Sequence, residues 1–295
     1  MIKINENEKD YAGKDNASAI VKKRLFLVLK YLSLAFFAFV AVLPLVSVLI
    51  TALKSNEEYA TTNVMALPAK INIANFADAF KTANMGIAFI NSTVILIFVL
   101  LISTVLGTQL AYILNRFQFK GNGLIRNLFL FATLLPGIAM QVSVYEIMTK
   151  LNLINHIYGY IILMCGTDII SIYVYIQYFE NIPTSLDESG IMDGAGYFRV
   201  YWSILLPLLK PAIVTSCILK GVGTYNEYYC ANLYLQDKTR YATVATSLYT
   251  FVGPLGSQYN MICAGVIISL LPALIVFITC QKQIYSGLTS GAVKG

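Results

Sequence analysis

Charged side chains are scarce in this sequence: only 12% of its 295 residues are charged, whereas 57% are hydrophobic. Soluble domains usually carry about 25% charged residues, because polar side chains must cover their surface. Apolar runs of about 20 residues, the length that a helix needs to cross a bilayer, recur along the chain. The scarcity of charge therefore excludes an ordinary soluble domain and indicates an integral membrane protein.

Residues suited to catalysis and metal binding are also scarce. His156 is the single histidine, and no H-E-x-x-H, G-x-S-x-G or phosphate-binding G-x-x-x-x-G-K-[ST] motif occurs. The five cysteines lie within or beside apolar runs without paired spacing, so we expect buried free thiols rather than a disulfide framework. These absences argue against a metal site, an enzyme active site and a cofactor bound by this chain.

The N-terminal segment lacks the features of a secretory signal. Residues 1–23 are polar and of mixed charge, with no apolar central region and no small-residue cleavage site. We expect them to form a flexible tail ahead of the first membrane span. The net charge of +6 includes no basic cluster interleaved with aromatic residues, which argues against nucleic-acid binding.

The apolar runs divide into six predicted transmembrane helices. Internal glycines and prolines do not exclude these helices, because neighbouring spans can satisfy the freed backbone groups. Pro44 is expected to kink the first span. The predicted spans cover residues 31–53, 86–115, 127–150, 157–179, 211–234 and 259–280. The sequence thus predicts an all-α polytopic membrane protein.

Lysine and arginine set the predicted orientation, because cytoplasmic loops carry an excess of both. With the N-terminus inside, the inner side receives Lys22, Lys23, Arg24, Lys30, Arg116, Lys120, Arg126, Arg199, Lys210, Lys282 and Lys294. Both termini are then cytoplasmic, and residues 24–85 hold the first span and an extracellular loop with a short interfacial helix at 75–80. Residues 86–285 form the transmembrane core, and residues 286–295 form a small, flexible cytoplasmic tail.

One cytoplasmic loop within the core, residues 183–211, is far more polar than its surroundings and reads PTSLDESGIMDGAGYFRVYWSILLPLLKP. Ser185 and Glu188 fit the S-x-x-E capping box that starts a helix. Thr184 and Asp187 offer the same device one residue earlier. The loop is therefore expected to begin with a short capped helix outside the membrane.

A second short helix is expected to follow a break at Asp193-Gly194, since Gly194 can adopt the left-handed conformation that ends a helix. Four apolar residues after the break recur at helical spacing and predict one face lying at the membrane interface: Phe198, Tyr201, Trp202 and Leu205. Two short helices joined at a glycine form a protruding elbow, which we call the elbow below. Such an elbow is a docking surface.

The spacing of residues in the elbow resembles the EAA loop of ATP-binding-cassette (ABC) importer permeases. In that family E-A-A is followed after three residues by G, after nine more by I, and then by L-P. The matching residues here are Glu188, Gly194, Ile204 and Leu206-Pro207. Ser189 and Gly190 stand where the family usually has two alanines. Glycine lowers helix propensity by about 1 kcal/mol, so we expect the first short helix to be less rigid.

Two further segments resemble carbohydrate permeases of this family. Tyr225-Asn226-Glu227 is similar to a W-N-E segment, with Tyr in place of Trp. The last nine residues, GLTSGAVKG, are similar to the G-L-T-A-G-A-V-K-G terminus of the maltose-type second permease subunit. The likeness therefore extends from the first span to the last residue.

The resemblance implies a fold, a location and a set of partners. The fold is that of type I importer permeases, with six transmembrane helices, in the plasma membrane of a bacterium. The chain would form half of a pore for a carbohydrate, together with a second permease subunit. An extracellular solute-binding protein would deliver the substrate, and a dimer of ATPase subunits would use ATP and Mg.

The resemblance also implies which residues meet the ATPase subunits. The EAA loop couples to them, and the residues that carry this role here are Glu188, Asp193, Gly194, Ala195 and Gly196. The C-terminal tail is expected to contact the ATPase subunits through Gly287, Leu288, Thr289, Gly291 and Lys294.

Ionisable side chains within spans are costly and indicate functional sites. Lys220 and Glu227 are seven residues apart, which predicts that they share one face of the fifth span. The residues that could line a sugar path are Lys220, Tyr225, Asn226, Glu227 and Tyr228. Asp168 and Glu146 could pair with each other or with the partner subunit. The structural alternative is that Asn226 and Glu227 join helices by hydrogen bonds.

Two functions from different classes compete. The leading prediction is a permease subunit of an ATP-driven carbohydrate importer. The alternative is an ion-coupled secondary transporter in which Asp168, Lys220 and Glu227 form the coupling site. That alternative leaves the elbow and the glycine-rich terminus unexplained. A membrane-embedded enzyme finds no support, because no catalytic constellation is present.

Overall fold

The computed structural model describes the backbone of residues 6–166, 168–253 and 256–292, and the side chains from Lys22 to Gln281 within these ranges. The first half holds α1 (Glu6–Ala52), α2 (Asn56–Thr61), α3 (Ala74–Thr82), α4 (Met85–Arg116), α5 (Asn122–Thr133), α6 (Gly137–Lys150), α7 (Ile157–Met164) and α8 (Ile169–Glu180). The second half holds α9 (Ser185–Met192), α10 (Tyr197–Val200), the π-helix η1 (Tyr201–Leu205), α11 (Leu206–Leu208), α12 (Lys210–Tyr225), α13 (Tyr229–Tyr234), α14 (Lys238–Tyr241), α15 (Val244–Ser247), the 3₁₀ helix η2 (Leu248–Phe251) and α16 (Tyr259–Ala292). A two-stranded antiparallel hairpin, β1 (Val252–Gly253) and β2 (Gly256–Ser257), precedes α16.

Three helices are each long and apolar enough to cross a membrane: residues 22–52 of α1, all of α4, and residues 259–281 of α16. Three pairs of shorter helices meet the same test only together, and each pair is bent. The bends are 105° between α5 and α6, 48° between α7 and α8, and 74° between the α10–α11 segment and α12. The described part of the chain therefore holds three unbroken candidate spans, and up to six if each bent pair is one span.

The third predicted span, residues 127–150, is not one continuous helix. α5 ends at Thr133 and α6 begins at Gly137, directly after Pro136. Proline has no backbone N–H and disfavours helical geometry in the residue before it, so a helix usually ends there. The prediction that Pro136 is tolerated inside a helix was wrong. Pro44 and Pro272 do lie inside α1 and α16.

The fifth predicted span, residues 211–234, is also divided. α12 ends at Tyr225, and α13 begins at Tyr229. The Asn226 amide donates to the Val222 carbonyl (3.0 Å), and a Glu227 carboxylate oxygen accepts from the Cys230 N–H (2.9 Å). The Cys230 N–H, which would donate to the Asn226 carbonyl in a continuous helix, is bound by the Glu227 side chain instead, so the helical hydrogen bonds are interrupted here.

Both terminal helices extend into segments that we expected to be flexible tails. α1 begins at Glu6, within the predicted tail 1–23, and α16 continues to Ala292, within the predicted tail 286–295. Extending an existing helix by one residue costs far less than nucleating a new one, so polar flanks can continue an apolar helix. Lys294 lies outside the described residues.

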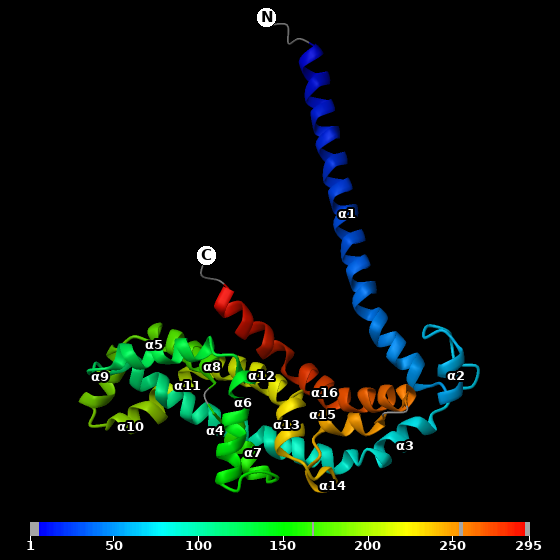
Figure 1. The fold of residues 1–295 in the computed structure, drawn as a ribbon. Coiled ribbons are helices and arrows are strands. Elements are labelled where there is room, and N and C mark those ends of the chain that lie inside the picture. The colour runs from blue at the N-terminus through cyan, green and yellow to red at the C-terminus, as the bar shows by residue number, and fades with distance from the viewer. Residues whose placement is uncertain (1–5, 167, 254–255, 293–295) are drawn as a thin grey trace, which may run out of the picture.

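α4 runs along the body of the molecule, with the elbow at its C-terminal end and α3 and α14 towards its N-terminal end (Figure 1). It packs against α8, α12 and α7. At Gly107 the Tyr175 ring lies 3.1 Å from the position that a Cβ would take, so glycine allows α4 and α8 to approach closely. A buried core at the elbow end joins these helices, with aromatic members Tyr112, Tyr175, Phe179 and Tyr201.

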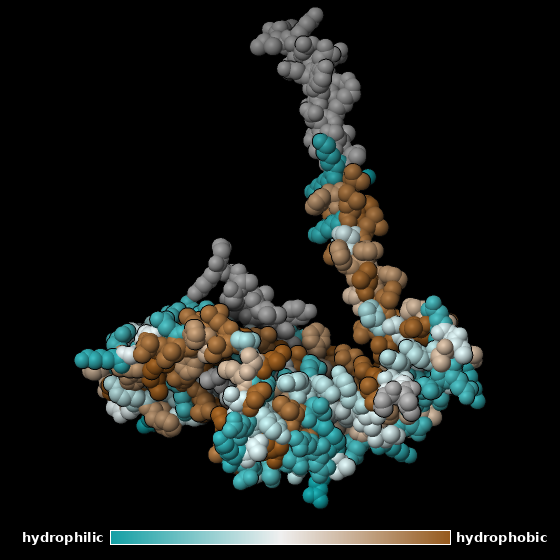
Figure 2. Space-filling view, viewed as in Figure 1, coloured by the Kyte–Doolittle hydropathy of each residue, from teal (hydrophilic) through white to brown (hydrophobic). Residues whose placement is uncertain are grey.

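α1 projects from this body (Figure 1), and hydrophobic residues cover most of its coloured surface, with hydrophilic residues near its upper end (Figure 2). Hydrophilic residues instead gather over α2 and α14 (Figure 2). In solution an apolar helix exposed along its length would be costly, whereas lipid or another membrane subunit can cover it. The surface therefore fits a chain that is surrounded by membrane.

The segment predicted as an interfacial helix at residues 75–80 forms α3, which packs against α16. Asn75 is buried, and its side-chain amide donates to the Ala52 and Lys54 carbonyls (2.8 Å each). The segment after α14 is tied to α4 by the Asn91 amide, which donates to the Arg240 and Ala242 carbonyls (2.8 and 2.9 Å). The short helices are thus fastened to the long ones through side-chain amides.

Candidate functional site

The elbow contains the predicted break at Gly194. α9 ends at Met192, and Gly194 has a φ of 84°, in the left-handed region that glycine adopts without strain. The Ala195 N–H donates to the Gly190 carbonyl and the Gly194 N–H to the Ile191 carbonyl, both at 2.9 Å. This pair of bonds is the Schellman motif, which satisfies the last carbonyls of a helix. The prediction of a glycine-ended short helix is confirmed.

The predicted capping boxes at the start of α9 are absent. Thr184 is the residue before the helix, and its side chain makes no capping bond. Its φ and ψ of −64° and −23° are already helical, whereas a capping side chain acts from an extended residue. Ser185 lies inside the helix, and its carbonyl accepts from the Ser189 hydroxyl (2.7 Å). Asp187 instead forms an ion pair with Arg116 (3.3 Å).

The second half of the elbow is not one amphipathic α-helix. α10 passes into the π-helical turn η1, which widens the turn and changes the register of the following side chains. Of the four residues predicted to share a face, Tyr201 and Leu205 are buried, whereas Phe198 is 72% exposed and Trp202 is 38% exposed. The Tyr201 hydroxyl lies 2.7 Å from the Thr108 hydroxyl of α4, so η1 is anchored to the transmembrane core.

Gly190 is buried where α9 meets η1. A Cβ at this position would lie 2.8 Å from Ile204 Cδ1 and 3.1 Å from Val200 Cγ2. The glycine that departs from the family pattern therefore allows close packing between the two halves of the elbow. The sequence predicts that Gly190 makes α9 less rigid. The structure shows that the same glycine also lets α9 pack closely against η1, and the sequence alone does not reveal this contact.

Four of the five predicted coupling residues are exposed, namely Glu188, Asp193, Gly194 and Gly196, and Ala195 is half-buried. Met192 beside them is 87% exposed. The elbow thus combines a buried inner face, fixed to α4 and α8, with an outer face that is free to meet another protein.

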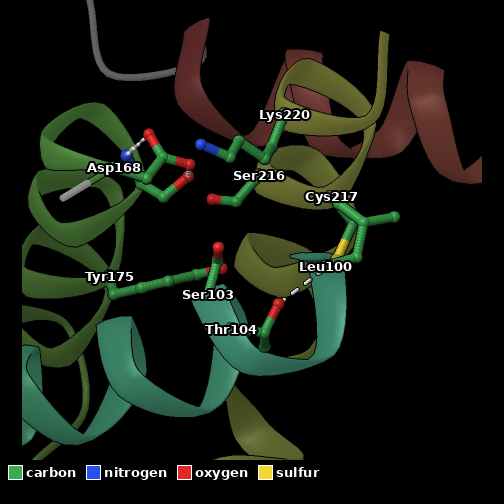
Figure 3. Close-up of a pocket in the computed structure, with 9 residues that line it drawn as sticks. Leu100, Ser103, Thr104, Asp168, Tyr175, Ser216, Cys217 and Lys220 are labelled. Atoms are coloured by element: carbon green, nitrogen blue, oxygen red, sulfur yellow. Dashed lines mark hydrogen bonds between the residues drawn. The ribbon is translucent and has the colours of Figure 1, made fainter. Parts of the chain in front are cut away.

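A second group of polar side chains lies among the membrane-embedded helices, between α4, α8 and α12 (Figure 3). We call it the polar cluster. It surrounds a small cavity, and its polar members are Ser103, Thr104, Asp168, Ser171, Tyr175, Ser216, Cys217 and Lys220. The Lys220 ammonium points towards the Asp168 carboxylate across the cluster (Figure 3).

Asp168 begins α8. One carboxylate oxygen accepts from the Ser171 N–H (3.4 Å) and the other from the Ser171 hydroxyl (2.6 Å). Two buried hydroxyls of the cluster, those of Ser103 and Ser216, have no protein partner. The cavity between them is about 10 Å³, close to the space that one water molecule requires. A polar site of this size suits a bridging water.

A larger groove of about 350 Å³ adjoins the polar cluster and is shared by three ionisable residues. Asp168, Lys220 and Glu227 reach it from α8, α12 and the turn between α12 and α13. The expectation that Lys220 and Glu227 lie on one face of a continuous helix was wrong, because α12 ends before Glu227. Both residues nevertheless line this groove, although they do not lie on one continuous helix.

The other three residues suggested for a sugar path have different contacts. The Tyr225 hydroxyl donates to the Ser269 carbonyl (2.8 Å) and joins α12 to α16. Asn226 caps the end of α12, and Tyr228 stacks on Tyr249 with ring centroids 3.8 Å apart. Only Lys220 and Glu227 of the five are among the residues that line the groove.

The suggested pairing of Glu146 with Asp168 is not present. Glu146 forms an exposed ion pair with Lys150, four residues later (2.7 Å), because α6 places both on one helix face. All five cysteines are free and half-buried.

The contacts of Arg116 and the serines of the polar cluster were not predicted from the sequence. The sequence does contain a feature that could have indicated these residues: Arg116 ends a long apolar run, and Ser103 and Ser216 lie within apolar runs. Single polar residues in such runs are common, however, and only the tertiary contacts distinguish these.

The described helices and the exposed elbow define a multi-pass membrane protein with an ordered polar loop at one end. A model of the family described as "binding-protein-dependent transport system inner membrane component" matches residues 103–285, which include the polar cluster and the elbow. The chain belongs to this family.

Two characterised relatives match most of the chain. The maltodextrin transport system permease protein MalD of Streptococcus pneumoniae is 31% identical and covers 95% of this chain and 100% of its own length. The melibiose/raffinose/stachyose import permease protein MelC of Bacillus subtilis is 30% identical and covers 86% of this chain and 91% of its own length.

The fold also matches a solved structure, that of a bacterial ABC transporter involved in the import of the acidic polysaccharide alginate. The TM-score is 0.76 at 21% identity, with 88% of this chain and 97% of the other covered. This likeness concerns the fold. Family membership places the chain in the bacterial inner membrane as a transport component, and it gives no support to the ion-coupled alternative.

Proposed function

We propose that this chain is one permease subunit of an ATP-driven ABC importer for a carbohydrate, with an oligosaccharide or glycoside as substrate. The observation that carries the proposal is the elbow: a rigidly ended short helix, anchored to α4, with its outer residues exposed. The relatives named above are a melibiose/raffinose/stachyose import permease protein and a maltodextrin transport system permease protein, which supports a carbohydrate substrate.

Four partners complete the proposed transporter. A second permease subunit would supply the other half of the pore, two ATPase subunits would bind ATP and Mg, and an extracellular binding protein would deliver the sugar. The chain would cross the membrane six times, with each bent helix pair as one span and both termini in the cytoplasm. It would bind no cofactor itself and catalyse no reaction.

The elbow would dock on an ATPase subunit through Glu188, Asp193, Gly194, Ala195 and Gly196. A Schellman end gives α9 a defined exit direction, so a force applied at the tip moves the helix as a unit. The C-terminal residues Gly287, Leu288, Thr289, Gly291 and Lys294 would make a further ATPase contact.

The sugar would pass along the groove that Asp168, Lys220 and Glu227 share. Carboxylates and an ammonium supply acceptors and donors for sugar hydroxyls, and such charged hydrogen bonds are stronger than neutral ones. We assign Tyr225 and Asn226 to helix packing, because their polar atoms already have partners. Tyr228, stacked on Tyr249, would offer an aromatic surface beside the path.

The proposal is tested by uptake of labelled raffinose and maltotriose in cells that depend on this transporter. Import should stop when ATP is depleted and should continue when the proton gradient is dissipated at constant ATP. The opposite pattern would support a secondary transporter and would exclude the proposed function.

A pair of glycine variants tests the role of the elbow. Gly194→Trp should abolish uptake and reduce recovery of the ATPase subunits with the permease. Gly121→Trp is the matched control, because Gly121 also has a positive φ (100°) and open space around its Cβ position but lies before α5. Equal loss of ATPase binding in both variants would contradict docking at the elbow.

A further inference from the structure

Arg116, the last residue of α4, makes three contacts with two other parts of the chain. Its guanidinium donates to the Ile182 carbonyl (2.8 Å), just beyond the end of α8. The same nitrogen lies 3.3 Å from a carboxylate oxygen of Asp187 in α9. The guanidinium carbon also lies over the Phe179 ring, 5.9 Å from its centroid, within the range of a cation–π interaction.

The Arg116–Asp187 pair differs in burial from the other ion pairs in the described part of the chain. Its side chains are 9% and 13% exposed, whereas those of Lys150 and Glu146 are 73% and 64% exposed. Exposed pairs are screened by water and salt and contribute little. A largely buried pair is screened less, and loss of one partner leaves a charge without compensation.

The pair joins the elbow to the helices that line the polar cluster. α4 carries Ser103 and Thr104 of that cluster, and α8 carries Ser171 and Tyr175. Arg116 ends α4, binds the carbonyl that follows α8, and holds α9 through Asp187. Arg116 thus connects α9 to the two helices that form walls of the polar cavity.

We propose that Arg116 is a positioning residue that couples the elbow to the polar cluster through its ion pair with Asp187. When an ATPase subunit moves the elbow, this pair makes α4 and α8 move with α9 instead of allowing α9 to slide against them. The inference rests on the proposed function, since it requires that the elbow is the part moved by ATP hydrolysis.

A residue with a purely structural role would affect assembly and every activity alike. The coupling role instead predicts a transporter that assembles and hydrolyses ATP but converts hydrolysis into uptake inefficiently. The number of sugars imported per ATP hydrolysed therefore separates the two roles. It is measured on the complete transporter in proteoliposomes, with the binding protein and labelled oligosaccharide supplied.

The test variant is Asp187→Asn, which keeps the shape of the side chain and removes its charge. Sugar imported per ATP should fall about 10-fold, within the range of energetic couplings between sites. The matched control is Glu146→Gln, the same chemical change in the exposed pair on α6, and its ratio should stay at the wild-type value. Arg116→Lys, which keeps the charge but loses the forked donor group, should give an intermediate ratio.

Three results would overturn either the coupling role of Arg116 or the proposed function. A wild-type ratio in Asp187→Asn overturns the proposal. If that variant does not assemble with the ATPase subunits, Arg116→Lys replaces it, and a wild-type ratio there overturns the proposal equally. A wild-type transporter whose ATP hydrolysis does not respond to sugar and binding protein would instead refute the proposed function.

Discussion

The close packing at Gly190 leads to a quantitative prediction about the elbow. Gly190→Ala should gain about 1 kcal/mol in helix propensity within α9. The new Cβ would meet Ile204 Cδ1 at 2.8 Å and Val200 Cγ2 at 3.1 Å. Overpacking typically costs about 1–3 kcal/mol, and the lower end applies here because the nearer atom is the mobile end of a side chain. The two terms almost cancel, so the single variant should change stability little.

The cancellation disappears when the opposing methyl group is removed. Ile204→Val deletes Cδ1 and should itself cost about 0.5–1.5 kcal/mol. In that background the Cβ of Gly190→Ala meets only Val200 Cγ2, at 3.1 Å, so the variant should stabilise the protein by up to about 1 kcal/mol. The double-mutant cycle over Gly190 and Ile204 should therefore give a favourable coupling of about 1 kcal/mol.

The assay is thermal unfolding of the purified transporter, followed by the loss of the intact complex in gel filtration after heating. A change of 1 kcal/mol corresponds to about 2 °C in a domain of this size. Gly123→Ala is the control, since no atom lies within 4 Å of its Cβ position, and it should act alike in both backgrounds. A Gly190–Ile204 coupling below about 0.3 kcal/mol would refute the packing argument.

Three further predictions follow from other contacts. Gly194→Asn should keep ATPase subunits bound in co-purification, because asparagine tolerates the left-handed region, whereas Gly194→Val should lose them. Equal binding by both variants would show that docking does not depend on the left-handed conformation of residue 194. Asn91→Ala removes the donor to the Arg240 and Ala242 carbonyls and should lower stability by about 2 kcal/mol. Protease should then cleave residues 235–257 faster, and unchanged cleavage would exclude this anchoring role. Glu227→Gln should raise the KM for uptake about tenfold, which is equivalent to about 1.4 kcal/mol. The control is Glu180→Gln, the same change at an exposed carboxylate, which should leave the KM unchanged. Equal KM values for the two variants would show that Glu227 does not line the sugar path.

The features that the sequence predicted well depend on local signals. The apolar runs of α4 and α16 required helices long enough to cross a bilayer, and these helices are present. The Asp193-Gly194 dipeptide indicated a helix end, and Gly194 adopts the expected positive φ. The spacing from Glu188 to Pro207 indicated the family, to which the chain belongs.

The features that the sequence did not predict depend on contacts between distant segments or on competition for backbone groups. The break after Tyr225 contains no glycine or proline, and there the Glu227 side chain binds the Cys230 N–H in place of a helical carbonyl. The π-helical turn η1 changes which aromatic residues are buried, and no local pattern marks it. Arg116 and Asp187 meet only because α4 and α9 pack together, so their pairing required the tertiary structure.

The aromatic group at η1 has a practical consequence. Trp202 is the single tryptophan of the chain, and its ring lies 5.5 Å from that of Tyr201 and 6.0 Å from that of Phe198. Partly exposed and within the elbow, it makes the intrinsic fluorescence of the isolated subunit a probe of this loop. Emission from this one indole would follow the proposed ATPase docking in real time, without any label, when tryptophan-free partner subunits are used.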